Sequence, residues 1–322
     1  MQSKYWHGLE RNVNPLGFGC WQLSGDYSVD GKPHGWGHIE EKEAVDLIHL
    51  ALDEGIQFFD TAAGYGHGRS EEILGLGIST SAGRNNAVIC TKIALTENEE
   101  NGNSLDKNFA DRVEMSLGRL RVDCIDVLLL HSPPDTLNWL NFDIGALEEL
   151  KVKGVIKTYG VSCRSLAGAR NAIECNFGTC LEWVFHLLER RPIYEIFPML
   201  SGANMNFIAR SPLSRGLFSS QYFERSPEFS STDFRFNLPA DWVNWTINSI
   251  RKVESLQQES ESLSSIAVKY CLGFEEMSVV IPGIKSTSHL NDFIKASKGA
   301  KLKRSIIEDI ERLTDDHYLG WA

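Results

Sequence analysis

Long apolar runs are missing from this sequence of 322 residues. The most apolar stretch, VLLL at residues 127–130, is far shorter than the roughly 18 residues that a membrane-spanning helix needs. The first ten residues, MQSKYWHGLE, lack the apolar segment of a secretory signal peptide. We therefore expect a cytoplasmic protein with no membrane partner.

Positive charge is also scarce. Lysine and arginine number 32 against 43 aspartates and glutamates, which gives a net charge of −11. This balance argues against nucleic acid or an anionic membrane as the main partner, because phosphate-rich surfaces bind a basic face. A local basic pocket for one small anion stays open. The remaining composition, 42% apolar and 23% charged, is that of an ordinary globular protein.

Cysteine pairs are absent as well. The seven cysteines are scattered without a CxxC motif, at positions 20, 90, 124, 163, 175, 180 and 271. Such a set argues against a disulfide framework and fits buried, reduced thiols in the cytosol. His34 and His38 flank a Gly-Trp-Gly turn without a third ligand, so no metal site is expected.

The sequence does contain a regular alternation of two patterns. Eight short, continuous apolar runs are typical of parallel strands buried on both faces; they span residues 15–20, 57–61, 88–92, 125–131, 158–163, 181–185, 207–211 and 278–282. Amphipathic helical patterns follow them, at residues 40–54, 70–78, 104–121, 144–153, 165–175, 242–259, 263–274, 286–296 and 304–313. This order predicts an α/β fold of the (β/α)8 TIM-barrel type rather than an open sheet.

The spacing of the elements also predicts the domain organisation. No linker rich in proline, glycine or serine interrupts the alternation, so we expect residues 1–322 to form a single domain. A short hairpin over residues 5–13 is expected to cap the bottom of the barrel. The interval between strand seven and strand eight is unusually long, and its segment 216–241 is aromatic and irregular. Long loops of this kind are usually functional, so it predicts a flap over the substrate or cofactor, with a packed structural excursion as the alternative.

Four polar residues lie at successive strand ends, where barrel enzymes place their catalytic groups. Asp60 and Tyr65 follow the second strand, Lys92 ends the third, and His131 ends the fourth. We expect Asp60 to pair with Lys92, and the Lys92 ammonium to lower the pKa of the Tyr65 phenol so that it acts as a general acid. His131 would hydrogen-bond a substrate carbonyl oxygen. Such a site protonates a developing alkoxide and needs a hydride from a reduced cofactor.

Motifs over nearly the whole chain resemble those of the aldo-keto reductase superfamily. They are GIQFFDTAAGYG at residues 55–66, SEEILG at 70–75, TK at 91–92, DVLLLH at 126–131, GVS at 160–162 and IPG at 281–283. The resemblance implies a barrel that binds a nicotinamide dinucleotide without a Rossmann domain, and the tetrad Asp60, Tyr65, Lys92 and His131. The activity implied is reversible reduction of an aldehyde or ketone to an alcohol, with a small carbonyl compound as substrate.

A phosphate site is expected where the last strand enters a helix. Residues 281–287 combine helix amides with Lys285 and the hydroxyls of Ser286 and Thr287. No acidic residue stands there to repel a 2′-phosphate, so NADP is favoured over NAD. The full set of residues expected to bind the cofactor is Gly19, Cys20, Trp21, Asp60, Ser162, Cys163, Glu182, Arg210, Ser211, Pro212, Leu213, Gly216, Gly283, Lys285, Ser286, Thr287, His289 and Asp292.

Several of these positions depart from the family pattern. Cys163 and Glu182 stand where the family usually has the asparagine and glutamine that hold the nicotinamide carboxamide, and Arg210 replaces an aromatic residue. His289, Asp292 and Phe293 stand where residues that contact adenine are common, which favours stacking. These departures support a second hypothesis, a cofactor-sensing subunit with little turnover like the β subunits of potassium channels. The identity of the substrate and the oligomeric state stay open.

Overall fold

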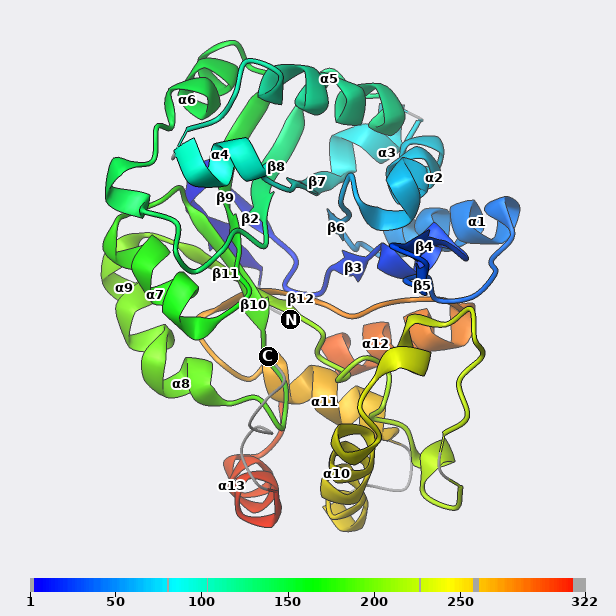
Figure 1. The fold of residues 1–322 in the computed structure, drawn as a ribbon. Coiled ribbons are helices and arrows are strands. Elements are labelled where there is room, and N and C mark those ends of the chain that lie inside the picture. Colours follow the sequence, from blue (N-terminus) through cyan, green and yellow to red (C-terminus); the bar gives the residue numbers. More distant parts are fainter. Residues whose placement is uncertain (1–2, 80, 103, 226, 257–260, 315–322) are drawn as a thin grey trace.

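The computed structural model describes residues 3–314 apart from 80, 103, 226 and 257–260. Its parallel strands form a barrel surrounded by helices (Figure 1). The sheet order is β12-β11-β10-β9-β8-β7-β6-β3, and its neighbours pair in parallel. Parallel bridges between Leu16 and Val280 and between Gly19 and Gly283 join the two edges. The strands are β3 (Phe18–Gly19), β6 (Phe58–Asp60), β7 (Val88–Ile93), β8 (Ile125–His131), β9 (Ile156–Ser162), β10 (Cys180–Val184), β11 (Asn206–Arg210) and β12 (Met277–Ile281).

This architecture confirms the predicted fold class. All eight expected strands are present, and their continuous burial explains the continuous apolar runs, since each strand packs against the barrel interior on one face and helices on the other. The helices that match predicted ones are α1 (Glu41–Asp53), α2 (Arg69–Gly77), α5 (Phe109–Leu120), α6 (Gly145–Val152), α7 (Leu166–Glu174), α10 (Ala240–Arg251), α11 (Leu263–Cys271), α12 (Thr287–Lys298) and α13 (Arg304–Leu313).

Some predicted boundaries were wrong, and some elements were not predicted. The helix expected from residue 104 begins only at Phe109, after a short bridge between Ser104 and Asp143. The helix expected over 242–259 ends at Arg251, and its residues 257–259 lie outside the described part of the chain. Unpredicted elements are β4 (Ser28–Val29), β5 (Lys32–Pro33), α3 (Ser81–Asn86), α4 (Glu97–Gly102), α8 (Arg191–Glu195) and α9 (Phe197–Ala203). Most are too short to show a periodic pattern.

The predicted N-terminal hairpin is present and closes the amino end of the barrel. Strands β1 (Lys4–Trp6) and β2 (Arg11–Val13) pair antiparallel. Trp6 is fully buried among apolar side chains of the barrel interior, with its ring 4.9 Å from that of Phe58. Asn206, at the start of β11, ties the hairpin down by accepting from the His7 amide and donating to the Tyr5 carbonyl. The opposite, carboxyl end of the barrel is left for the site.

The segment between β11 and β12 is not a single long loop. Its described residues contain α10, α11 and three 3-10 turns, two of which, η5 (Ser220–Tyr222) and η6 (Phe234–Asn237), interrupt the irregular segment. Asn237 of η6 donates to the Pro33 carbonyl of β5 at 3.5 Å. In the segment after β5, the Gly35 carbonyl accepts from the Phe234 amide at 2.9 Å, and Trp36 bridges to Asp233, the residue before η6. The β4–β5 region and the segment around η6, about 200 residues apart in sequence, therefore cover the barrel mouth together. None of the helices in the described ranges has the length and hydropathy to cross a membrane.

Replacing the buried indole at the amino end should destabilise the protein. We expect Trp6→Ala to lower the free energy of unfolding by about 3–5 kcal/mol, because it removes a large buried aromatic side chain and leaves a cavity. Urea denaturation followed by circular dichroism measures the change. The neighbouring Tyr5→Ala is the matched control, since Tyr5 is 51% exposed and its loss should cost no more than about 0.5 kcal/mol. Equal effects of the two substitutions would contradict the role of Trp6 in closing the barrel.

Candidate active site

The four predicted catalytic residues meet at the carboxyl end of the barrel. Asp60 ends β6, Lys92 lies in β7, His131 ends β8, and Tyr65 lies in the turn that follows β6. Both Asp60 carboxylate oxygens accept hydrogen bonds from Lys92 Nζ at 2.6 Å. Lys92 Nζ lies 5.2 Å from the centre of the Tyr65 ring, and the rings of Tyr65 and His131 meet edge to face at 5.8 Å. The geometry thus groups the phenol, ammonium and imidazole around one point.

Glu182 adds a second carboxylate to this group. It projects from β10, is 1% exposed, and places Oε2 3.4 Å from Lys92 Nζ. Its Oε1 accepts a hydrogen bond from Ser162 Oγ at 3.0 Å. Burial alone would lower the pKa of the Lys92 ammonium, but the two carboxylates raise it well above its usual value. Lys92 is therefore a permanent cation at the base of the site.

Lys92 lowers the pKa of the Tyr65 phenol, as expected, but the net shift of that pKa is upward, opposite to the expected result. Burial raises the pKa of the Tyr65 phenol, Asp60 and Glu182 raise it further, and the Lys92 charge lowers it too little to compensate. Burial is the largest cause, because a phenolate removed from water is costly, and the carboxylates that the phenol also faces offset part of the effect of the ammonium. Tyr65 consequently stays protonated at neutral pH, which is the state required of a proton donor.

His131 is held in its neutral form. Burial and the nearby positive charge of Lys92 lower the pKa of its imidazole to about 3. A neutral imidazole offers one N–H donor and one acceptor, so it can orient an uncharged carbonyl oxygen without competing for the proton that Tyr65 holds.

A tight turn presents Tyr65 to the mouth. Residues 66–68 adopt positive φ values of 62°, 53° and 99°, and two of the three are glycines, which tolerate this conformation. A Cβ at Gly68 would lie 2.5 Å from the Arg119 side chain, so the turn also packs closely. On its outer face the Tyr65 ring stacks on Trp21 at 5.6 Å.

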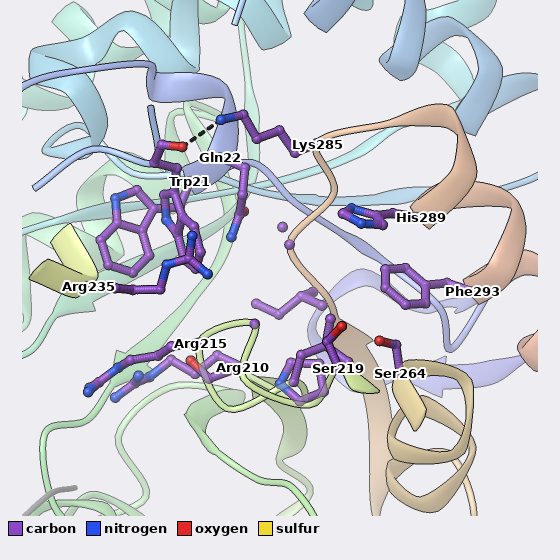
Figure 2. A pocket seen from close by; sticks show the side chains of 18 of the residues that line it. Trp21, Gln22, Arg210, Arg215, Ser219, Arg235, Ser264, Lys285, His289 and Phe293 are labelled. Atoms are coloured by element: carbon purple, nitrogen blue, oxygen red, sulfur yellow. Dashed lines mark hydrogen bonds between the residues drawn. The ribbon is translucent and has the colours of Figure 1, made fainter. Parts of the chain in front are cut away.

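A cavity of about 320 Å³ extends from this group toward α12. Figure 2 shows Trp21 and Arg235 on one side of it, and His289 and Phe293 on the other. The predicted site residues that line the cavity are Gly19, Trp21, Asp60, Tyr65, Glu182, Arg210, Ser211, Pro212, Leu213, Gly216, Gly283, Lys285 and His289. The other predicted site residues do not line the cavity; they are Cys20, Lys92, His131, Ser162, Cys163, Ser286, Thr287 and Asp292.

Several lining residues were not among the individually predicted site residues, although four of them lie in the predicted flap segment 216–241. They are Gln22, Trp36, Arg215, Ser219, Gln221, Tyr222, Arg235, Ser264 and Ile281. Trp36 and Arg235 come from the β4–β5 hairpin side and from η6, and only the fold brings them together, with the guanidinium 5.0 Å from the Trp36 ring. Arg215 had a signal in the sequence, because it lies two residues after the predicted Leu213 in the same loop.

The polar groups at the predicted phosphate site are partly engaged within the protein. Lys285 Nζ donates to the Trp36 carbonyl at 2.6 Å, which ties the end of β12 to the β4–β5 hairpin (Figure 2). Ser286 caps α12 by accepting from the His289 amide at 3.2 Å. Lys285 still lines the cavity with its ammonium bound to the Trp36 carbonyl, whereas the hydroxyl of Ser286 satisfies the helix end.

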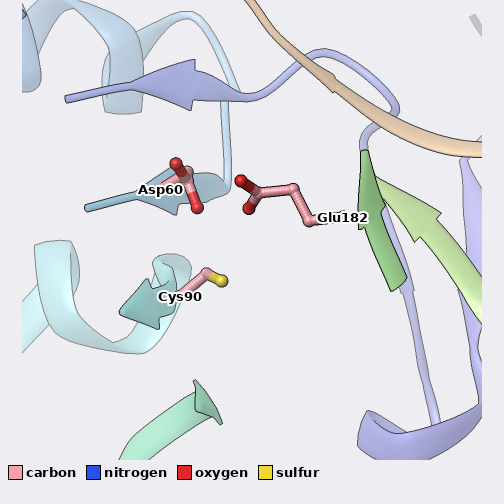
Figure 3. A group of neighbouring side chains, drawn as sticks. All are labelled: Asp60, Cys90 and Glu182. Carbon is pink, nitrogen blue, oxygen red and sulfur yellow. The ribbon is translucent and has the colours of Figure 1, made fainter. Parts of the chain in front are cut away.

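Within the described ranges, one group of side chains has ligand atoms close enough for a metal ion. Asp60, Cys90 and Glu182 bring ligand atoms within 4.8 Å of one another, and Figure 3 shows the two carboxylates facing each other. Burial keeps the Cys90 thiol protonated by raising its pKa, and Lys92 already supplies a cation to both carboxylates. A metal ion would have to displace that ammonium, so the cluster is better explained as an ion-pair network.

The neutral state of His131 can be tested by NMR. Its imidazole should show no titration between pH 8 and 4.5, because its pKa in the folded protein is about 3. Unfolded histidine takes up a proton near pH 6.5, so this residue should reduce the stability of the fold as the pH falls from about 6.5 toward 3. The resonance is assigned with His131→Gln, and the urea-unfolded chain is the control. A midpoint near 6.5 in the folded protein would contradict the buried, neutral imidazole.

Comparisons with known proteins agree with this geometry. The model of the Aldo/keto reductase family matches residues 15–315. The chain is 26% identical to aldo-keto reductase YhdN of Bacillus subtilis over 88% of this chain and 84% of that protein. It is also 26% identical to a probable voltage-gated potassium channel subunit beta of Arabidopsis thaliana, over 92% and 91% of the two chains.

A solved structure shares the fold. The aldo/keto reductase of Klebsiella pneumoniae in complex with NADP and acetate superposes with a TM-score of 0.72, at 19% identity, over 98% of this chain and 97% of that one. The family match covers nearly all of the described barrel and includes every strand end that contributes to the site. The chain belongs to the aldo/keto reductase family.

Proposed function

We propose that this protein is an NADP-dependent oxidoreductase that reduces an aldehyde or ketone to an alcohol, reversibly. The observation that supports it most is the protonated Tyr65 phenol, held beside the Lys92 ammonium and the neutral His131 imidazole at one end of the cavity. Family membership supports an oxidoreductase in general; the carbonyl chemistry and the cofactor are inferred from the site.

The residues of the cavity fit a nicotinamide dinucleotide phosphate. The carboxylate of Glu182 lies at the barrel mouth, where it can accept a hydrogen bond from a carboxamide amine. Cations suited to phosphates line the cavity, and the stacked rings of His289 and Phe293, with centres 6.3 Å apart, offer an apolar face on the side opposite Trp21. When bound, NADPH would supply the hydride that the protein itself lacks.

The protein's own contribution is to position the substrate oxygen and give it a proton. The neutral His131 imidazole donates a hydrogen bond that orients the carbonyl toward Tyr65. As negative charge develops on that oxygen, the Tyr65 phenol transfers its proton, and the Lys92 ammonium stabilises the phenolate that remains. Asp60 keeps Lys92 in place through two hydrogen bonds of 2.6 Å. In the reverse direction the phenolate accepts the proton of an alcohol.

Aromatic side chains next to Tyr65 would shape the substrate pocket. Trp21 contacts Trp36 at 5.4 Å and Phe234 at 4.8 Å between ring centres, so the loop after β3, the β4–β5 region and η6 form one wall. Of the wall residues, Phe234 belongs to the flap segment, and Trp21 stacks on the proton donor Tyr65. The wall suits a small carbonyl compound with an apolar or ring-shaped body.

Removing the phenolic oxygen tests the mechanism. We expect Tyr65→Phe to reduce turnover of a carbonyl panel with NADPH at least about 100-fold, because a general acid contributes that much or more. Binding of NADPH, measured by tryptophan fluorescence, should change little. Tyr159→Phe is the matched control, because its phenol bonds to Glu148 away from the cavity. Turnover that survives in Tyr65→Phe would contradict this mechanism.

Lys285 should determine the preference for the 2′-phosphate. Lys285→Ala should weaken NADPH binding about tenfold or more while leaving NADH binding nearly unchanged, since a charged hydrogen bond to phosphate is lost. Isothermal titration calorimetry with both nucleotides measures the two dissociation constants. Lys298→Ala, at the far end of the helix α12 that follows Lys285, is the control, because Lys298 pairs with Glu54. Equal affinities for NADH and NADPH in the native protein, unchanged by Lys285→Ala, would refute the assignment.

A cofactor-sensing role is the second candidate, and the similarity to the probable channel subunit favours it. The two functions share the nucleotide site and differ in turnover. Tight NADPH binding by the native protein without oxidation in the presence of any carbonyl of the panel would support the sensor. Oxidation that depends on Tyr65 would support the enzyme.

A further inference from the structure

Glu182 places a buried carboxylate where the resemblance to the family predicts a neutral glutamine. Its Oε1 accepts one hydrogen bond, from Ser162, but its Oε2 is buried and accepts none from any described residue. A buried carboxylate oxygen without a donor is costly, and a proton held between it and the neighbouring Asp60 carboxylate would supply the missing hydrogen bond. The geometry therefore marks this end of the cavity as a place where a proton can be held.

Asp60 and Glu182 also compete for one cation. Lys92 Nζ lies 2.6 Å from both oxygens of Asp60 but 3.4 Å from the nearest oxygen of Glu182. One ammonium cannot neutralise two carboxylates in a buried site, and like charges this close favour retention of a shared proton. In agreement, burial and the charge of Glu182 raise the pKa of Asp60 to about 8 despite the opposing effect of Lys92.

The other groups that face the pair do not remove this imbalance. The thiols of Cys20, Cys90, Cys163 and Cys180 and the phenol of Tyr65 are neutral, because burial raises the pKa of each. The imidazole of His131 is neutral as well. Arg210 is the remaining cation, with Nε 4.0 Å from Glu182 Oε1, but its side chain is 26% exposed and so is better screened than the carboxylates.

We propose that the Asp60–Glu182 pair couples the redox state of the bound cofactor to a proton. The oxidised nicotinamide ring carries a positive charge and the reduced ring carries none. Binding of NADP⁺ would then expel the shared proton to solvent, one positive charge entering as another leaves, whereas binding of NADPH would leave the pair protonated. This inference rests on the proposed function, since it assumes that a nicotinamide reaches this end of the cavity.

The sign of the pH dependence follows from linkage. In the pH range where the free site holds the proton, NADP⁺ must displace it, so its affinity should rise by up to tenfold for each unit of increasing pH. The affinity for NADPH gains nothing from this pair. The 2′-phosphate is common to both forms, so its titration cancels in the ratio of the two dissociation constants. The ratio Kd(NADPH)/Kd(NADP⁺) should therefore rise with pH.

The test measures this ratio in the full chain from pH 6 to pH 9 by quenching of tryptophan fluorescence. We expect it to increase at least about tenfold, the effect of one unit of pKa shift by a nearby charge. Calorimetry in two buffers of different ionisation enthalpy measures the protons released on binding. Binding of NADP⁺ should release a proton from the carboxylate pair, whereas binding of NADPH should release only the protons that come from its own phosphate. Glu182→Gln should give a flat ratio, and Glu182→Asp should keep the slope.

Glu99→Gln is the matched control, because Glu99 is also 1% exposed but pairs with Arg112 outside the cavity. It should retain the slope of the native protein. Two results would overturn the coupling but not the proposed function. One is that the native protein binds both nucleotides with a ratio of dissociation constants that does not change with pH. The other is that this ratio rises as steeply with pH in Glu182→Gln as in the native protein. Failure of the native protein to bind either nucleotide overturns the proposed function and the coupling with it. If Glu182→Gln does not fold, proton release by the native protein decides the matter by itself.

Discussion

The buried ammonium of Lys92 is the interaction on which the site depends. Taking this charge out of water is costly unless carboxylates accompany it, and here Asp60 and Glu182 come from strands on different sides of the barrel mouth. The register of β6, β7 and β10 must therefore be correct for any of the three charges to be tolerated. Once they are in place, the same network determines the protonation of Tyr65 and His131.

The mouth is completed by segments that lie far from the barrel strands in sequence. The Lys285 ammonium joins the end of β12 to Trp36, and η6 pairs with the β4–β5 region through Phe234. These contacts enclose a cavity whose lining combines carboxylates, aromatic rings and cations, with His289 and Phe293 on the side opposite Trp21 (Figure 2). Such a lining suits a ligand that carries both flat rings and negatively charged groups.

Much of the barrel could be predicted because parallel strands buried on both faces leave a simple signal. The run of residues 125–131 was predicted to the residue as β8, and its polar end correctly placed His131 at the mouth. Short helices such as α8 and the delayed start of α5 were missed, since they are set by contacts with neighbouring segments rather than by periodicity. The Asp60–Lys92 pair was predicted from strand-end spacing and is present.

The sequence by itself determined the order of strands, the residue types at their ends and the motifs that indicate the family, because all of these depend on local pattern and on the rule that parallel strands end at one face. Tertiary structure alone decided how strongly each group is buried and which charges share a partner. That is why the raised pKa of Tyr65, the competition of Glu182 for Lys92, and the approach of Lys285 to Trp36 could not be read from spacing. Electrostatic energies depend on distances and burial in three dimensions, which a linear pattern does not contain.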